Sequence, residues 1–449
     1  MFESMPDRPP RASRPPRNVA ESPLSARWRP SVTEKAVLVG VGPGYDEERL
    51  DELAALATTA GAEPVARVVQ ARSDPDPATF VGKGKIREVH EALHRNGAEA
   101  AIFDDELSPG QLRNLEERLG VKVVDRTALI LDIFALHARS REGKAQVELA
   151  QLNYLLPRLR GWGEAMSRLG GGIGTRGPGE TKLEVDRQHI RRRITRLRRD
   201  IADLSRTRAT KRSRREASGI PQMALAGYTN AGKSTLMNAL TSARVLVADQ
   251  LFATLDPTVR RVALPGGRKA TLSDTVGFVS KLPHDLVESF RSTLEEVALA
   301  SLVLHVADGS APELDRQVAA VREVLAEIGA GDIPEVLALN KIDLLPGEDR
   351  ARLGRRFPGA IHVSARTGEG LEDLLEAVVR TLPAPPVEVM LLVPFDREDV
   401  IARLYREAEV LAREPNTEGT VVRARVGKHQ LAWTKQFLAR PVSHRTTVG

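Results

Sequence analysis

The chain contains no cysteine among its 449 residues, and this absence removes two classes of site at once. Neither a disulfide nor a thiolate metal site can form, which fits a reducing compartment. Long apolar runs are also missing: nothing approaches the ~18 uncharged apolar residues of a membrane-spanning helix, because Leu129–Leu136 is short and contains Asp132. The N-terminus lacks the apolar segment of a secretion signal. We therefore expect a cytosolic protein without a transmembrane segment.

Length and local composition predict several domains. A chain of this size is expected to hold about two to four of them. Residues 1–33 are rich in proline and arginine and are expected to form a disordered tail. Strand-like and helix-like runs alternate over 34–135, which predicts a small α/β domain. In that domain Gly82-Lys-Gly-Lys85 is either a phosphate contact or, more simply, a polar turn.

Three further regions complete the expected organisation. We predict a helical hairpin at 136–217, an α/β domain with a mostly parallel sheet at 218–383, and a small α/β domain at 384–449. For the last domain we expect a strand at Val387–Val393, a helix at Arg397–Ala412 and a strand at Thr420–Val426.

A phosphate-binding loop lies in the predicted α/β domain at 218–383. Residues 227–234 match G-x-x-x-x-G-K-[ST] between the strand-like run Gln222–Ala226 and the helix-like run Lys233–Thr241. Its glycines let backbone N–H groups surround phosphate oxygens, Lys233 neutralises phosphate charge, and the Ser234 hydroxyl can ligate Mg²⁺. The predicted phosphate-binding residues are Gly227, Tyr228, Thr229, Asn230, Ala231, Gly232, Lys233, Ser234 and Thr235.

Three more motifs follow in the order typical of guanine-nucleotide sites: Asp274–Gly277, Asn340–Asp343 and Ser364–Arg366. Each follows a strand-like run, so all should meet at the carboxyl edge of one parallel sheet. The Asp343 carboxylate can accept guanine N1–H and 2-amino hydrogen bonds, which adenine does not offer. The predicted nucleotide-binding residues here are Asp274, Thr275, Val276, Gly277, Asn340, Lys341, Ile342, Asp343, Ser364, Ala365 and Arg366.

These motifs, over about 218–383, resemble the translation-factor-related GTPases. The resemblance implies that Asn340 reads the base edge, that Lys341 lies over the base, and that the Ala365 N–H meets guanine O6. It places a first switch at Phe252, Ala253, Thr254, Leu255 and Asp256. A threonine there closes onto Mg²⁺ and the γ-phosphate. Thr254 is preferred with Ser234 as a metal ligand, and Thr258 is the alternative. Lys233, Thr254 and Gly277 are the predicted catalytic residues.

One catalytic group is missing. Ras-like enzymes place a glutamine directly after Asp-x-x-Gly to orient water, whereas this chain has Phe278. We therefore expect slow intrinsic GTP hydrolysis that a large partner accelerates. Some GTPases use an asparagine at the position of Asn230 to hold K⁺; a loop-capping asparagine is the alternative.

A basic segment precedes the phosphate-binding loop. Thirteen Arg or Lys residues stand against three Asp between Asp186 and Arg215, so with a net charge of +6 the rest of the chain is slightly acidic. Apolar residues repeat there at alternating spacings of four and three: Ile190, Ile194, Leu197, Ile201 and Leu204. The same spacing joins Ala145, Leu149, Leu152, Leu156 and Leu159. Two such helices predict an antiparallel hairpin with arginines on its other faces. These suit RNA phosphates, since no base-reading motif for DNA is visible; a solvated helix face is the alternative.

Between the two predicted helices, residues 170–180 read Gly-Gly-Gly-Ile-Gly-Thr-Arg-Gly-Pro-Gly-Glu. This tip, the basic helix and the switch string Phe-Ala-Thr-Leu-Asp-Pro together closely resemble HflX, a family of bacterial ribosome-associated GTPases, from about residue 34 to the end. The resemblance implies a monomer that binds GTP/GDP and Mg²⁺. It also implies a large-subunit and ribosomal-RNA partner, and splitting or rescue of stalled or idle ribosomes under stress. It leaves ATP binding by the N-terminal domain open. The alternatives are a regulatory G protein near the membrane, peripherally associated with it, and an ATP-dependent RNA remodeller.

Overall fold

The computed structural model describes residues 34–43, 45, 47–159, 178–216, 220–241, 251–252, 255, 258–279, 291–383 and 387–439. These residues fall into two compact units. The first is drawn from Met1–Ile133 and Gln151–Trp162, and the second from Phe134–Ala150 and Gly163–Gly449.

The first unit is built on a four-stranded parallel sheet in the order β2-β1-β3-β4. Its strands are β1 (Glu34–Val41), β2 (Ala62–Gln70), β3 (Ala100–Phe103) and β4 (Lys122–Asp125). Six consecutive residues of β1 and all four residues of β3 are buried. Such continuous buried runs are typical of a parallel sheet, because helices cover both of its faces. The expectation of an N-terminal α/β fold is confirmed.

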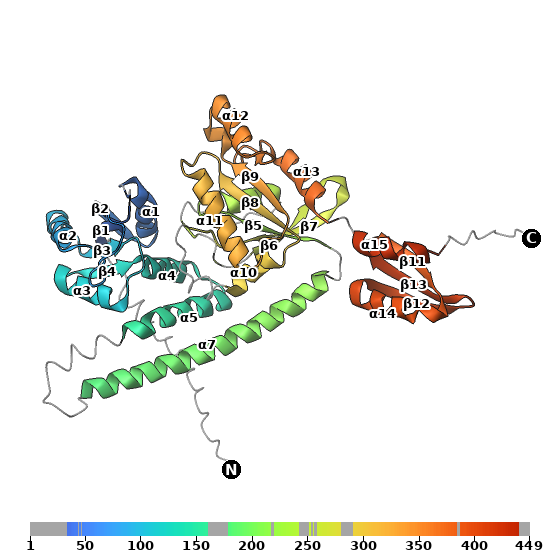
Figure 1. Cartoon of the computed structure of the whole chain (residues 1–449), viewed down its shortest axis with the longest axis horizontal. Helices are drawn as coiled ribbons and strands as arrows, with labels where there is room; N and C mark the ends of the chain where they lie inside the picture. The colour runs from blue at the N-terminus through green and yellow to red at the C-terminus, as the bar shows by residue number, and fades with distance from the viewer. Residues whose placement is uncertain are drawn as a thin grey trace, which may run out of the picture. The chain divides into compact units, whose positions relative to one another are not determined.

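Helices connect these strands on both faces of the sheet (Figure 1). They are α1 (Asp51–Thr59), which follows the short 3₁₀ turn η1 (Glu48–Leu50), α2 (Lys83–Asn96), α3 (Pro109–Leu119) and the start of α4 (Arg126–His137). Apolar residues of α2 and α3 share one core with β1, β3 and β4. Ser108 begins α3 with a reciprocal capping box to Gln111, a signal that the sequence carries. Gly82 is the N-cap of α2, where its N–H donates to the Gln70 side chain.

The second unit contains a six-stranded sheet in the order β10-β9-β8-β5-β7-β6, and only β6 is antiparallel to its neighbour. The strands are β5 (Gln222–Ala226), β6 (Thr258–Ala263), β7 (Lys269–Asp274), β8 (Leu302–Asp308), β9 (Glu335–Asn340) and β10 (Ile361–His362); a 3₁₀ turn, η2 (Pro265–Gly267), joins β6 to β7. The predicted mostly parallel sheet is therefore confirmed.

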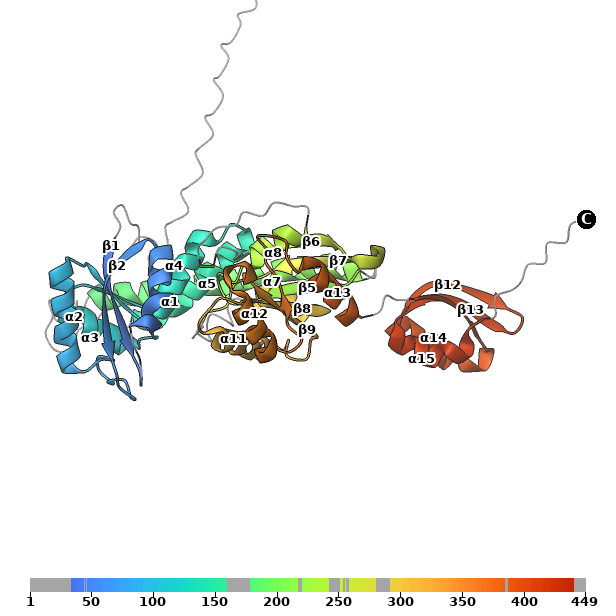
Figure 2. The ribbon, with the colours of Figure 1, turned by 90° about the horizontal axis from the view of Figure 1, so that it is seen from above.

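Two layers of helices enclose this sheet (Figure 2). On one face α8 (Lys233–Leu240) and α13 (Leu371–Thr381) contribute to one core; on the other, α10 (Arg291–Ala298) and α11 (Leu314–Glu327) contribute to a second core. The short η3 (Ile342–Leu344) and α12 (Gly347–Arg356) follow β9. All parallel strands run in one direction, so the loops after β5, β7, β8, β9 and β10 share one edge.

Within the described residues, two helices lie between α4 and β5 in the chain. α5 (Arg141–Arg158) and α7 (Pro178–Glu216) carry the two predicted apolar seams, except that Leu159 lies one residue beyond the end of α5. In α7, Ile194 and Leu197 are buried while their neighbours are exposed. Arg193 donates two 2.7 Å hydrogen bonds to Glu148, which fixes this part of α5 beside α7. The Gly-rich tip at 170–180 lies outside the described residues, apart from the start of α7.

The C-terminal residues form a three-stranded antiparallel sheet in the order β11-β13-β12 with its own core. The elements are β11 (Val387–Val393), η4 (Phe395–Arg397), α14 (Glu398–Glu407), β12 (Glu409–Asn416), β13 (Gly419–Val426), α15 (Lys428–Thr434) and η5 (Lys435–Phe437). The predicted helix over Arg397–Ala412 is wrong beyond Glu407. Ala408 is already extended, and Val410 pairs with Ala424 in a hairpin that local periodicity does not reveal.

Candidate functional site

The phosphate-binding loop lies between β5 and α8, as its sequence indicates. Gly232 has a φ of 88°, and a Cβ there would lie 2.3 Å from the Asn340 amide nitrogen, so only glycine fits. The phosphate-binding loop therefore packs against Asn340, the first residue of the Asn340–Asp343 motif. Asn230 also has a positive φ, 58°, which asparagine tolerates, and its side chain is exposed.

Lys233 is a buried cation. Its Nζ donates to the carbonyl oxygens of Gly227 at 2.9 Å and Tyr228 at 2.8 Å. Burial lowers the pKa of Lys233 to about 8, although the negative charge of Asp274 acts in the opposite direction. The ammonium group is thus held within the loop, where phosphate oxygens would replace part of the solvation that it has lost.

Two oxygen ligands suited to a divalent cation lie next to each other. The Ser234 hydroxyl at the start of α8 donates to the Asp274 carboxylate at 2.8 Å. Asp274 is fully buried at the end of β7, and its other oxygen accepts the Thr275 N–H at 3.0 Å. A hydroxyl and a carboxylate are the hard ligands that Mg²⁺ prefers, so this pair fits the predicted metal. No cluster of three or more acidic or histidine ligands occurs within the described part of the chain.

The segment after Asp274 lies against the phosphate-binding loop. Thr229 N–H donates to Phe278 O at 2.7 Å, and Phe278 N–H donates to Gly227 O at 3.1 Å. A Cβ on Gly277 would lie 2.8 Å from the Thr229 methyl carbon and 3.1 Å from Lys233 Nζ. Phe278 itself is 1% exposed and belongs to the core. Its side chain is therefore packed into the core beside the phosphate-binding loop.

The first switch is only partly described. Ala253, Thr254 and Asp256 lie outside the described residues, while Leu255 is buried. Phe252 is also buried with a φ of 57°, and its ring meets that of Phe134 edge-on, with centroids 4.7 Å apart. Thr258, the alternative metal ligand, begins β6 directly opposite Asp274. The contact with Phe134 has no sequence signal, because the two residues are 118 positions apart.

Asn340 connects the phosphate-binding loop with the loop after β10. Its amide donates to Ala231 O at 2.9 Å, and its Oδ1 accepts the Ala365 N–H at 2.9 Å. Asn340 and the Ala365 N–H, which the resemblance assigns to the base, bond to each other in this structure. The buried amide thereby connects the phosphate-binding loop to the loop after β10.

Asp343 and Lys341 belong to the motif that is expected to read the base. The Ser364 hydroxyl donates to one Asp343 oxygen at 2.7 Å, and the Arg366 guanidinium pairs with the other at 2.7 Å. The Ser364 hydrogen bond, together with the Arg366 charge, lowers the pKa of Asp343, so it is an anion at neutral pH. Lys341 Nζ pairs with Asp308 at 2.8 Å. Asp308 was not predicted, although its position at the end of β8 places it on the same sheet edge.

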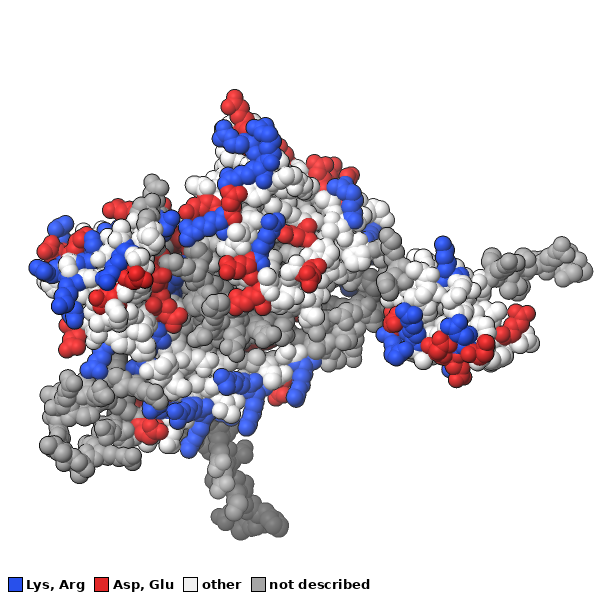
Figure 3. All heavy atoms as spheres, viewed as in Figure 1, with Lys and Arg blue, Asp and Glu red and all other residues white. Residues whose placement is uncertain are grey.

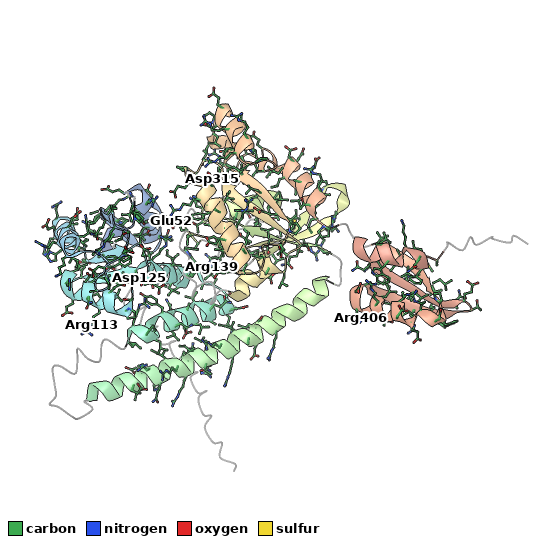
Figure 4. All side chains as sticks on the ribbon, viewed as in Figure 1. Glu52, Arg113, Asp125, Arg139, Asp315 and Arg406 are labelled. Carbon is green, nitrogen blue, oxygen red and sulfur yellow. The ribbon has the colours of Figure 1, made fainter. Side chains whose placement is uncertain are left out.

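A basic surface lies on α7, apart from this site. Arg191, Arg192, Arg196, Arg198 and Arg199 are all exposed on the helix. Figure 3 shows Lys and Arg side chains gathered along it. Elsewhere, carboxylates neutralise arginines. In the first unit, buried Arg126 pairs with Asp104 and with Glu52, which is labelled in Figure 4. Lys85, from the predicted Gly82-Lys-Gly-Lys85 turn, pairs with Glu88 at 2.5 Å. Among the described residues, no helix is long and apolar enough to cross a bilayer.

Comparisons with known proteins cover nearly the whole chain. Four family profiles match: "GTP-binding GTPase N-terminal" at 47–135, "GTP-binding GTPase Middle Region" at 137–215, "50S ribosome-binding GTPase" at 222–341 and "HflX C-terminal domain" at 353–433. The chain is 49% identical to the GTPase HflX of Caldanaerobacter subterraneus subsp. tengcongensis over 88% of its length and 91% of that protein. It is 43% identical to the GTPase HflX of Escherichia coli, over 86% and 92% respectively.

Among solved structures, the chain is similar to a GTP-binding protein from Sulfolobus solfataricus in complex with GDP. The identity is 25%, with a TM-score of 0.40, over 78% of this chain and 98% of that one.

Proposed function

The chain belongs to the HflX family of GTPases, and on that premise we propose that its GTP-bound form binds the large ribosomal subunit and splits or rescues stalled or idle ribosomes. As a member of this family it hydrolyses GTP to GDP and phosphate. The observation that carries the proposal is that the phosphate-binding loop, Asp274 and Asp343 lie in one sheet-edge site, in a chain whose longest described helix, α7, exposes a row of arginines.

The proposed chemistry assigns each residue one task. Lys233 neutralises phosphate charge, Gly277 offers its N–H to the γ-phosphate, and the Asp343 carboxylate selects guanine. Ser234 and Thr254 hold Mg²⁺, with Asp274 beside Ser234; the bound ion supplies charge stabilisation at the phosphates. Apart from Arg366, whose guanidinium pairs with Asp343, the remaining motif residues retain the binding roles that the sequence predicts.

Slow intrinsic hydrolysis is part of the proposal. The buried Phe278 side chain cannot hydrogen-bond water, so the attacking water lacks an orienting group on this segment. A ribosome that orders the switch segments would supply this orientation. We expect large ribosomal subunits to raise the turnover rate by at least about tenfold, since a positioned acid–base group alone contributes roughly 10²–10⁴-fold.

The test compares nucleotide states and partners directly. The full-length protein is co-sedimented with large subunits in the presence of GDP or a non-hydrolysable GTP analogue, and GTP turnover is measured with and without subunits. We expect retention with the analogue, loss with GDP, and stimulated turnover. Binding that is equal in both nucleotide states, or turnover unchanged by subunits, would refute the ribosome as the regulated partner.

A further inference from the structure

The carboxylate that would read guanine is already occupied by a side chain of the protein. Arg366 Nη2 lies 2.7 Å from Asp343 Oδ2, while Ser364 occupies Oδ1. The Asp343 side chain is 11% exposed, whereas that of Arg366 is 74% exposed. The pair thus joins a sheltered acceptor to a donor that reaches in from the solvent.

The chemistry of the two donors is closely matched. The guanine edge presents N1–H and a 2-amino group, two N–H donors on one plane, to the carboxylate. A guanidinium presents the same kind of planar N–H fork to carboxylates. Arg366 therefore offers Asp343 the type of contact that the base would offer, at one of the oxygens that the base needs.

Ser364 and Asn340, the buried side chains near Asp343, cannot leave their partners at low cost in free energy. Ser364 is fully buried, and its hydroxyl oxygen also accepts the Thr367 N–H at 3.2 Å. Asn340 is 2% exposed and holds both Ala231 and Ala365. Removing either from its partners would leave a buried polar group unsatisfied. Arg366 alone among these partners can return its charge to water.

We propose that Arg366 is a placeholder for guanine: it occupies Asp343 when the site is empty and is displaced by the base, so it weakens nucleotide binding and favours exchange. The inference rests on the proposed function, in which Asp343 reads the base. Without Arg366 the empty site would present a sheltered carboxylate with half of its partners missing. With Arg366 the empty state is stabilised, and release of GDP exposes no unpaired anion.

The test is a titration of the full-length protein with a fluorescent GDP analogue, together with its dissociation rate by stopped flow. Because the competitor is removed, Arg366→Ala should bind GDP about two- to fivefold more tightly, the range expected for an exposed ion pair. The difference from the unaltered protein should shrink as salt screens that pair. Weaker or unchanged GDP binding by Arg366→Ala would overturn the placeholder role.

A matched control separates this role from a change in net charge. Arg352 is 73% exposed, close to the 74% of Arg366, and pairs with Asp349 at 3.3 Å on α12, so Arg352→Ala removes the same charge from an equally exposed arginine. We expect it to leave GDP affinity unchanged. An equal tightening in Arg352→Ala would show a general electrostatic effect and refute the inference.

Asp343→Asn distinguishes failure of this inference from failure of the base-reading proposal. That variant should prefer xanthosine over guanosine diphosphate, and in its background Arg366→Ala should no longer tighten binding. Unchanged base preference would refute guanine reading by Asp343. A normal switch to xanthosine, with Arg366→Ala still tightening binding as before, would refute only the placeholder.

Discussion

Lys233 combines deep burial with a positive charge, and this gives nucleotide binding a pH dependence. In the empty protein its pKa is lowered to about 8 by burial. Bound phosphates would raise that pKa, because they stabilise the charged form. The affinity gained from Lys233 is therefore fully present below about pH 8 and is lost as pH rises from there toward the pKa of the bound state.

Calorimetry of GDP binding at pH 8 checks this directly. About half of the empty protein then carries a neutral Lys233, so binding should take up roughly half a proton, seen as an enthalpy that varies with the buffer. Nucleotide phosphates are already deprotonated at that pH and do not mask the effect. Lys233→Arg, which does not titrate in this range, serves as the control. The same uptake in Lys233→Arg would assign the proton to another group.

The limits of prediction from sequence are clearest at single residues. The motifs locate Lys233, Ser234 and Asp343 because their chemistry is tied to fixed spacings. Contacts such as Phe252 with Phe134 and Lys341 with Asp308 bring distant residues together, and no local pattern encodes them. The internal bonding of Asn340 to Ala365 is also invisible in the sequence, since the motif fixes positions but not partners.

Among the secondary-structure elements, the buried strands and the helices with clear apolar periodicity could be predicted. The error at Arg397–Ala412 has a defined cause. Apolar residues continue at helical spacing past Glu407, but hydrogen bonding to β13 converts 409–416 into a strand. Tertiary pairing overrides local preference there, as is common for strands. By contrast, the seam of α7 follows its predicted residues.

Leu197 is the most buried apolar residue of that seam, at 3% exposed. Leu197→Ala should cost about 2–4 kcal/mol of local stability, because truncation of this buried side chain leaves a cavity. Backbone hydrogen exchange along α7 should then accelerate by at least about tenfold. Arg198→Ala changes the adjacent exposed residue and should leave exchange nearly unchanged. If both variants exchange alike, this part of α7 is not held by its apolar face.

At the scale of the whole molecule, some arginines form ion pairs with carboxylates, whereas others are exposed in a row on α7. Many arginines outside α7 pair with carboxylates, as Arg356 does with Asp315 and Arg322 with Glu335. On α7, Arg192, Arg196 and Arg199 are spaced by four and three residues, and they lie on the side of the helix away from its buried seam. Among the described residues, this surface presents a row of exposed arginines, the side chain that suits a phosphate backbone.

Replacing these three arginines with glutamine should therefore weaken binding to the large subunit while leaving intrinsic GTP hydrolysis unchanged. Log affinity falls as log salt rises, and each lost phosphate contact makes this slope shallower by about 0.7–0.9. The slope of the triple variant should therefore be shallower by roughly two to three units. Co-sedimentation over a salt series with a GTP analogue measures it. The matched control neutralises Arg316, Arg352 and Arg380, three exposed arginines elsewhere in the second unit. Since net charge falls equally in both, an equal loss in the control would show that binding depends on total charge and not on α7.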